Sequence, residues 1–199
     1  GVVLHPHQRA PEGAWATWLM LGGRGAGKTF AGAWWLAEQA MRLGAGGRLA
    51  LVGATLHDVR EVMVEGASGL VGLPRWTRAD GSWDGPVYEA SRRRVRFPGG
   101  AYAYAFSAED ADSLRGPQFH AAWADEFCAW AGDPGRTLAV LRAGLRLTSR
   151  SDQADRDPST PSGSPSPRCG EEKPRLVVTT TPRPMRALRE LRAEPGFVE

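Results

Sequence analysis

The 199-residue sequence contains few cysteines, few lysines and no long apolar run, and each scarcity excludes a class of protein. Its two cysteines, Cys128 and Cys169, are too few for a disulfide framework or a zinc site, which favours a reducing cytoplasm. No apolar run approaches the roughly 20 residues that span a bilayer, so we expect no transmembrane helix and no membrane partner. No charged segment followed by an apolar one opens the chain, so we expect no signal peptide.

The overall composition is that of a folded protein. Hydrophobic residues make up 42% and charged residues 24%, which excludes wholesale disorder. The net charge of +3 permits a nucleic-acid partner without requiring one. Only two of the 25 basic residues, Lys28 and Lys173, are lysines, and the other 23 are arginines. The position of Lys28 is therefore informative.

Strand-like and helix-like segments alternate along the chain. Apolar runs predict strands over residues 15–21, 48–53, 119–124 and 175–180, and helical spacing predicts helices over 28–43, 56–65, 136–147 and 184–193. A hairpin is expected between 92–97 and 101–106. This alternation predicts an α/β fold with a mostly parallel sheet and helices on both faces. The low-complexity segment 149–174 has almost no apolar residue and is expected to be a disordered insertion.

A phosphate-binding motif lies between the first predicted strand and helix. The pattern G-x-x-x-x-G-K-[ST] is matched by Gly22, Gly23, Arg24, Gly25, Ala26, Gly27, Lys28 and Thr29. Backbone N–H groups of such a loop point at phosphate oxygens. Lys28 would neutralise the β and γ phosphates of ATP, and the Thr29 hydroxyl would bind Mg²⁺. An ordinary glycine turn does not explain why one of two lysines stands at the required position.

The apolar run 121–124 ends in two acids, the Walker B arrangement. Asp125 would hold Mg²⁺, mostly through water, and Glu126 would polarise the attacking water. An adjacent acid there indicates hydrolysis rather than kinase-type transfer. Strands that end in an acid at a helix N-cap show the same pattern, but a phosphate loop upstream favours the catalytic interpretation.

Two further segments have residues that suit a nucleotide-binding site, and three tryptophans suit the core. Gln8 lies just upstream of the first strand, where some helicase-like ATPases read adenine with a glutamine, and a frayed terminus is the alternative. The last strand ends in hydroxyl residues, where a γ-phosphate sensor would lie, although threonines are common at strand ends. We expect the tryptophans that stand in apolar runs, Trp18, Trp34 and Trp123, to lie in the core.

Four motifs, in order, resemble the large terminase subunit of tailed bacteriophages and gene transfer agents. They are PHQ at 6–8, WLMLGGRGAGKTFAGAWW at 18–35, SLRGPQFHAAWADE at 113–126 and VVTTTPRP at 177–184. The resemblance covers nearly the whole chain apart from 149–174. It implies an ATPase domain over residues 1–199, with a RecA-like additional-strand P-loop fold. It also assigns Gln8 to the adenine motif, Arg24 to the arginine-bearing phosphate loop, and Thr179, Thr180 and Thr181 to the coupling motif.

The resemblance further implies a motor that hydrolyses ATP with Mg²⁺ to move double-stranded DNA into a capsid. Its expected partners are the portal protein, the small terminase subunit and further copies of itself in a ring. Its expected place is the bacterial host cytoplasm, at the procapsid portal. Because the chain lacks an initiator methionine and ends abruptly at Glu199, we expect a fragment without the family's C-terminal nuclease, and therefore no nuclease activity.

Several arginines are candidates for contacts with DNA or a neighbouring subunit. Arg92, Arg94 and Arg96 alternate along a predicted strand and would form a stripe for DNA phosphates, or else protect an edge strand by charge. Arg115 is either a finger acting on a neighbouring subunit or a structural arginine. Arg24 is a catalytic candidate that could sense the γ-phosphate in its own site or contact a neighbour.

Two other functions remain open from the residues. One is a helicase-like, nucleic-acid-stimulated P-loop ATPase that packages no genome. The other is an ATP-binding remnant without productive turnover, uncoupled by the insertion. ATP turnover by the purified chain separates the remnant from the two enzymes.

Overall fold

The computed structural model describes residues 4–148 and 173–199, which form one eight-stranded sheet in the order β3-β4-β5-β2-β6-β7-β1-β8. The strands are β1 (Thr17–Leu21), β2 (Arg48–Gly53), β3 (Val87–Glu89), β4 (Arg94–Arg96), β5 (Tyr102–Ser107), β6 (Ala121–Asp125), β7 (Arg175–Thr180) and β8 (Phe197–Val198). Pairing is parallel from β5 through to β8 and antiparallel where β3 and β4 extend the sheet. The predicted mostly parallel sheet is confirmed.

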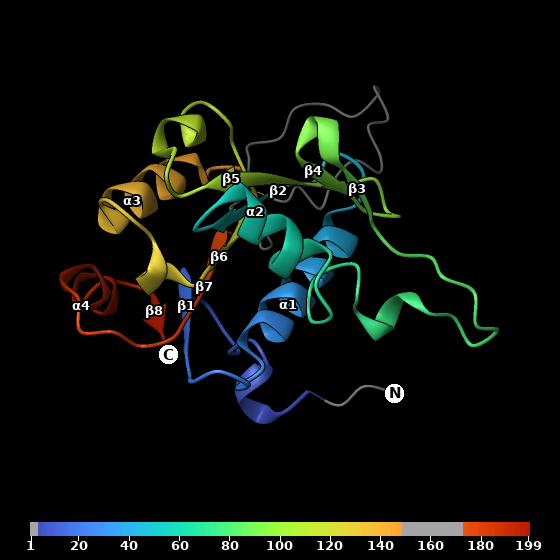
Figure 1. Cartoon of the computed structure of the whole chain (residues 1–199), viewed down its shortest axis with the longest axis horizontal. Coiled ribbons are helices and arrows are strands. Elements are labelled where there is room, and N and C mark those ends of the chain that lie inside the picture. The colour runs from blue at the N-terminus through green and yellow to red at the C-terminus, as the bar shows by residue number, and fades with distance from the viewer. Residues whose placement is uncertain (1–3, 149–172) are drawn as a thin grey trace, which may run out of the picture.

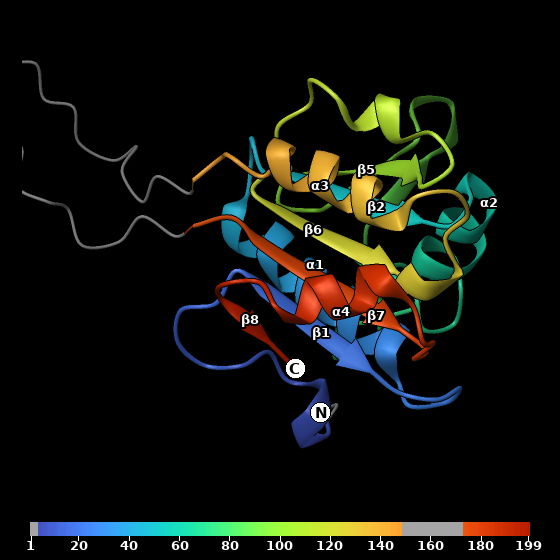
Figure 2. The same ribbon diagram turned by 90° about the vertical axis from the view of Figure 1, so that its left-hand side faces the viewer.

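Helices cover both faces of the sheet, as expected. They are α1 (Lys28–Leu43), α2 (Leu56–Asp58), α3 (Pro134–Gly144) and α4 (Arg186–Arg192). In Figure 1, α1 and α2 lie on one side of the sheet and α3 and α4 on the other, and Figure 2 shows α3 and α4 in front of it. Alternate residues of β6 enter the two cores, Trp123 on the α1 side and Ala122 and Ala124 on the α3 side. Burial on both faces explains why these strands are continuous apolar runs in the sequence.

The strand order inserts β7 between β1 and β6. β7 pairs in parallel with both neighbours, with Thr180 opposite Leu21 and Thr179 opposite Asp125. An additional strand between the phosphate-loop strand and the acidic strand defines the expected fold, which is thereby confirmed. Because the carboxyl ends of adjacent parallel strands meet at one edge, residues 22–29, 125–126 and 179–181 come together there.

The helices predicted over residues 56–65, 136–147 and 184–193 are present, but their observed bounds differ from the predicted ones. The first is α2 continued by a π-helix over Val59–Val64. The second, α3, starts earlier because the Asp133 side chain accepts the backbone N–H of Arg136 at 3.0 Å and caps the helix. The third, α4, begins after Pro184 rather than at it.

The predicted hairpin is confirmed, since β4 pairs antiparallel with β5. The expected row of Arg92, Arg94 and Arg96 along one strand is wrong. Arg92 ends the 3-10 turn Ala90–Arg92, and Arg93 adopts a left-handed conformation with φ 47° before β4 begins. The edge-strand alternative is also wrong for β4, because β3 lies outside it.

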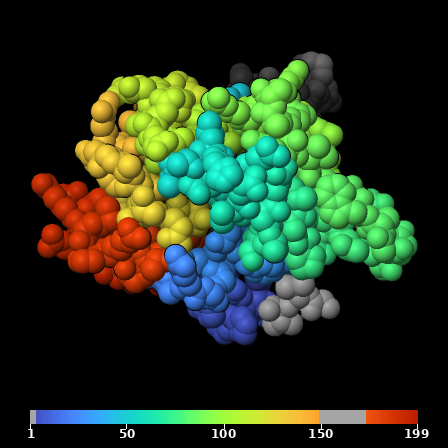
Figure 3. All heavy atoms as spheres, viewed as in Figure 1, coloured from blue at the N-terminus to red at the C-terminus, as the bar shows by residue number. Residues whose placement is uncertain are grey.

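Two short strands were not predicted from the sequence. β3 extends the hairpin, and β8 pairs with the start of β1, with Phe197 opposite Thr17. The exposed residues 77–84, before β3, project from the body of the molecule (Figure 3).

The expected insertion and the expected lack of a transmembrane helix both depend on which residues the structure describes. The insertion 149–174 lies outside them, apart from Lys173 and Pro174. Within 4–148 and 173–199, no helix combines the length and apolar character needed to cross a bilayer.

Candidate nucleotide-binding site

The glycine-rich loop connects β1 to α1 and ends at Gly27, the N-cap of α1. Gly27 has φ 74°, in the left-handed region that favours glycine. A Cβ on Gly27 would lie 2.2 Å from Nε2 of Gln8, which donates to the Gly27 carbonyl at 3.4 Å. The fold therefore brings Gln8, in the 3-10 turn Pro6–Gln8, against the end of the loop.

Lys28 opens α1, and its side chain is only 7% exposed. Its Nζ donates to the carbonyls of Gly22 at 2.8 Å and Gly23 at 3.0 Å, and to the hydroxyl of Thr181 at 3.4 Å. An ammonium group has three N–H donors, so these acceptors satisfy it. The same nitrogen lies 3.7 Å from Oε1 of Glu126. Lys28 thus connects the loop, the end of β6 and the end of β7.

Asp125 is the last residue of β6 and is 4% exposed. Its carboxylate accepts a hydrogen bond from the Thr179 hydroxyl, and its carbonyl accepts one from Nε1 of Trp130 at 2.9 Å. Burial, and then the charge of Glu126, raise the pKa of Asp125 to about 6 against the opposing effects of Thr179 and Lys28. A bound cation would compensate this cost of the ionised form.

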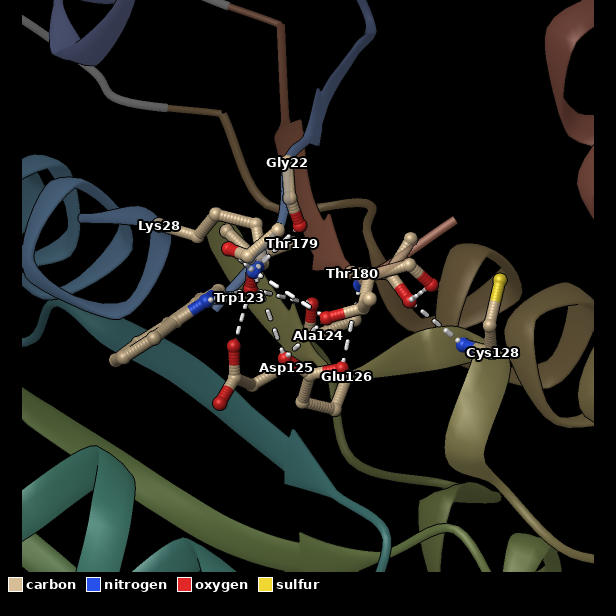
Figure 4. A network of polar contacts seen from close by, with 11 residues as sticks. Gly22, Lys28, Trp123, Ala124, Asp125, Glu126, Cys128, Thr179 and Thr180 are labelled. Atoms are coloured by element: carbon tan, nitrogen blue, oxygen red, sulfur yellow. Dashed lines mark hydrogen bonds and ion pairs between the residues drawn. The ribbon is translucent and has the colours of Figure 1, made fainter. Parts of the chain in front are cut away.

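Glu126 follows with φ 48° and ψ 45°, a left-handed conformation that costs a non-glycine residue about 1 kcal/mol or more. Its carboxylate, 42% exposed, accepts hydrogen bonds from the backbone N–H of Thr181 at 3.2 Å and from the Thr181 hydroxyl at 3.3 Å. Lys28, Asp125 and Glu126 converge from α1 and β6 in Figure 4. The adjacent acids therefore have different environments, one buried and one open to solvent.

The three threonines at the end of β7 each bond a different part of the acidic segment. Thr179 donates to the Asp125 carboxylate, and Thr180 accepts the backbone N–H of Cys128 at 2.9 Å. Thr181 donates to Glu126. The end of β7 is therefore bonded to both acids and to the turn that follows them.

The donor set fits a magnesium ion. The Asp125 carboxylate and the hydroxyl of Thr29, the second residue of α1, are oxygen ligands of the kind Mg²⁺ prefers. In the described part of the chain, no three His, Cys, Asp or Glu residues gather as a metal cluster. Mg²⁺ that arrives with a nucleotide needs only one or two protein ligands, because phosphate oxygens and water complete its shell.

Two candidate arginines lie exposed on separate parts of the surface. Arg24 is exposed within the glycine-rich loop. Arg115 forms an ion pair with Asp112 at 2.8 Å. It also lines a hollow of about 420 Å³ beside α3, together with Arg136 and Arg146. No hydrogen bond or ion pair within 4–148 and 173–199 joins either candidate to the two acids.

The arginines of β4 are held by a residue of the neighbouring strand. Nε of Arg94 lies 2.6 Å from Glu89, and its guanidinium stacks 4.1 Å from the centre of the Tyr102 ring. Nε of Arg96 lies 3.5 Å from the same glutamate. Arg94 is 16% exposed and Arg96 48%, so their surroundings differ despite the alternation.

Sequence reasoning missed the contact between Trp123 and this site. Trp123 is buried as expected, but its Nε1 donates to the Thr179 hydroxyl at 2.9 Å. Its place two residues before Asp125 was the available signal, because strand residues i and i+2 share a face.

Residues 19–164 match the family model described as terminase large subunit, T4likevirus-type, N-terminal. The chain belongs to the terminase large-subunit family. The predicted resemblance is thereby confirmed. A comparison with curated proteins finds no match.

Solved terminase structures share the fold of this terminase chain. One large terminase, from a thermophilic bacteriophage, is 16% identical, with TM-score 0.55 over 89% of this chain and 35% of that one. The same phage protein in complex with ADP is 15% identical, with TM-score 0.53 over 84% and 33%. The large terminase ATPase domain of Thermus phage P74-26 is 17% identical, with TM-score 0.54 over 99% and 73%. This terminase chain therefore spans about a third of the length of the first of these proteins.

Proposed function

We propose that this terminase chain binds Mg²⁺-ATP and hydrolyses it as the motor domain that drives double-stranded DNA into a capsid. The observation that carries the proposal is the convergence of Lys28, Asp125 and Glu126 at one edge of the sheet (Figure 4). Membership of the terminase family supports it. So does the fold shared with a thermophilic bacteriophage terminase whose structure holds ADP.

The phosphate groups of ATP would lie in the loop from Gly22 to Gly27. Lys28 would exchange its bonds to the loop carbonyls for phosphate oxygens, because an anion attracts an ammonium more strongly than a neutral carbonyl does. Gln8, which touches the end of the loop, would read the adenine. Arg24 is exposed in the same loop and would contact the γ-phosphate or a neighbouring subunit.

Hydrolysis would depend on the different environments of the two acids. Asp125 and Thr29 would hold Mg²⁺, which would neutralise charge on the β and γ phosphates. Glu126, the more exposed acid, would accept a hydrogen bond from water and polarise it for attack on the γ-phosphorus, releasing ADP and phosphate. Its bonds from Thr181 and its proximity to Lys28 orient the carboxylate.

Thr179, Thr180 and Thr181 would couple this chemistry to movement. Because the end of β7 is bonded to both acids, a shift of either carboxylate would be transmitted to that strand. DNA phosphates would meet the exposed Arg92 and Arg96.

Contacts with other subunits are proposed from membership of the terminase family. Arg115, exposed beside the hollow near α3, would act on a neighbouring subunit of a ring. Portal protein and small terminase subunit would be the further partners, at the procapsid in the host cytoplasm.

ATP hydrolysis by the purified chain tests this function, with and without double-stranded DNA. We expect turnover in the wild type, none in Lys28→Ala, and normal turnover in Lys173→Ala, which removes the other lysine of the chain. Nucleotide binding without turnover in the wild type would instead favour an ATP-binding remnant. Turnover stimulated by DNA, with no packaging into procapsids, would favour the helicase-like ATPase.

A further inference from the structure

A buried chain of hydrogen bonds joins the core beneath α1 to Asp125. Trp123 and Thr179 are both 0% exposed. Trp123 shares a face of β6 with Asp125, and Thr179 is the register partner of Asp125 in β7. Nε1 of Trp123 donates to Oγ1 of Thr179 at 2.9 Å, and Oγ1 of Thr179 donates to the Asp125 carboxylate (Figure 4).

The chemistry of the three groups decides which of them donates and which accepts in each of these hydrogen bonds. An indole N–H can only donate, whereas a hydroxyl donates one hydrogen and accepts at two lone pairs. Oγ1 of Thr179 has a second acceptor within reach, the Ala124 carbonyl at 3.3 Å. Because the indole N–H occupies one lone pair of Thr179, it restricts the rotation of the hydroxyl and keeps its hydrogen directed at the nearer carboxylate.

The indole ring is itself fixed by α1. A Cβ added to Gly32 would lie 2.4 Å from Cε2 and Nε1 of Trp123, so the ring packs directly on the helix backbone at this glycine. α1 is the helix that begins with Lys28. The same helix therefore carries the phosphate-binding lysine and holds the donor at the start of the hydrogen-bond chain.

We propose that Trp123 is a positioning residue that, through Thr179, holds Asp125 in the orientation that receives the Mg²⁺ of a bound nucleotide. This inference rests on the proposed function, because only a nucleotide-bound cation gives Asp125 that role. Outer partners of metal ligands typically change metal affinity by about 10- to 100-fold when removed. A tryptophan that merely filled the core would have no such effect.

The first test removes the N–H by Trp123→Phe. The full chain is titrated with a fluorescent ADP analogue at increasing Mg²⁺ and, separately, in EDTA. We expect the Mg²⁺ concentration for half-maximal tightening to rise by about tenfold, with affinity in EDTA unchanged. Trp76→Phe is the matched control, because Trp76 is also buried and donates to the Leu70 carbonyl at 2.6 Å. Its Mg²⁺ dependence should equal that of the wild type.

Further variants separate the hydrogen bond from the packing of the ring. Incorporation of 3-benzothienylalanine at position 123 keeps the bicyclic shape and replaces the N–H by sulfur, so it should reproduce the tenfold change even where Trp123→Phe folds poorly. Thr179→Val, which keeps the shape of the side chain without the hydroxyl, should also reproduce it. Thr179→Ser, which retains the hydroxyl, should restore the wild-type Mg²⁺ dependence.

The outcomes distinguish this inference from the proposed function. Wild-type Mg²⁺ dependence in the benzothienylalanine protein would overturn the role of Trp123 and leave the nucleotide site intact. The same result in Thr179→Val would overturn the relay through the hydroxyl. A nucleotide affinity that does not depend on Mg²⁺ in the wild type would overturn both the proposed function and the role of the hydrogen bonds from Trp123 through Thr179 to Asp125.

Discussion

Two edges of the sheet carry residues that the sequence marked as functional candidates, and the spatial arrangement of these residues differs between the two edges. At the carboxyl edge, segments ending β1, β6 and β7 lie together, and Lys28, Asp125 and Glu126 converge. At the hairpin edge, the three alternating arginines separate, one in a turn and two held by Glu89. The candidate residues therefore lie together at one edge and apart at the other.

The difference lies in what fixes each arrangement. A phosphate loop is positioned by backbone conformation between a strand and a helix, and parallel strands bring their carboxyl ends to a common edge whatever the side chains do. A stripe of side chains depends on an unbroken period of two, so one residue outside the strand destroys it. Arg93, with φ 47°, is such a residue.

Lys28→Ala should abolish measurable ATP hydrolysis, a loss of about 10³-fold or more, because a point charge on the transferring phosphoryl group is removed. The measurement is phosphate release at saturating ATP, alongside Lys173→Ala. Normal turnover in Lys28→Ala would show that the convergence at the carboxyl edge is not a catalytic site.

Glu126→Gln should retain binding of Mg²⁺-ATP and lose turnover by about 10²- to 10⁴-fold, since general-base catalysis of this kind contributes that much. Asp125, Thr29 and Lys28 remain in place, so affinity should change little. Equilibrium binding and single-turnover hydrolysis separate the two effects. Loss of binding in a folded variant would instead make Glu126 structural.

Asp125→Asn should raise the free energy of unfolding at pH 7.5 in EDTA by about 3 kcal/mol. This figure follows from the pKa of Asp125, which folding raises from 3.8 to about 6, so that the ionised carboxylate destabilises the folded wild type. The folded wild type binds this proton more tightly than the unfolded chain does. Protonation of Asp125 therefore stabilises the wild type fully below about pH 4, and this contribution is lost as the pH rises through 6. Asparagine does not titrate, so the gap in unfolding free energy between variant and wild type should grow over that range.

Urea unfolding at a series of pH values measures this gap. Asp112→Asn, which removes an aspartate carboxylate that is 70% exposed, is the control for the same substitution at the surface. A gap for Asp125→Asn that is constant with pH would contradict the raised pKa.

Arg94→Gln and Arg96→Gln should differ in opposite senses at the hairpin edge. Arg94→Gln should lower Tm more, because that side chain is paired with Glu89 and stacked on Tyr102. Arg96→Gln should weaken DNA binding more and reduce the slope of log affinity against log salt by about 0.9, the value for one lost phosphate contact. Thermal denaturation and DNA binding at several salt concentrations measure both. Equal effects of the two substitutions on Tm and on DNA binding would support a stripe in which both arginines have the same role.

The sequence predicted the α/β class, the hairpin and the members of the central sheet, since burial on both faces leaves apolar runs that are readable without coordinates. It did not predict β3 or β8, because strands of two or three residues are too short to show a period. The start of α3 shifted because the Asp133 cap decides where that helix begins and apolar spacing does not.

Within the site, local motif chemistry marked residues 22–29, 125 and 126, since each motif is contiguous and its spacing has a mechanical reason. The bonds from Thr181 to Glu126, and from Trp123 through Thr179 to Asp125, were beyond its reach. They join residues far apart in the chain, and their existence depends on the insertion of β7 between β1 and β6.

The sequence by itself determined the composition of the phosphate loop, the acids at the end of a buried strand and the alternation of strands with helices, because these properties belong to contiguous residues. Only the tertiary structure decided which carboxylate is buried, which threonine bonds which acid and which arginine stays exposed. Those properties depend on neighbours that strand order and side-chain packing supply, and a hydrogen bond of about 3 Å forms only where the completed sheet places donor and acceptor together.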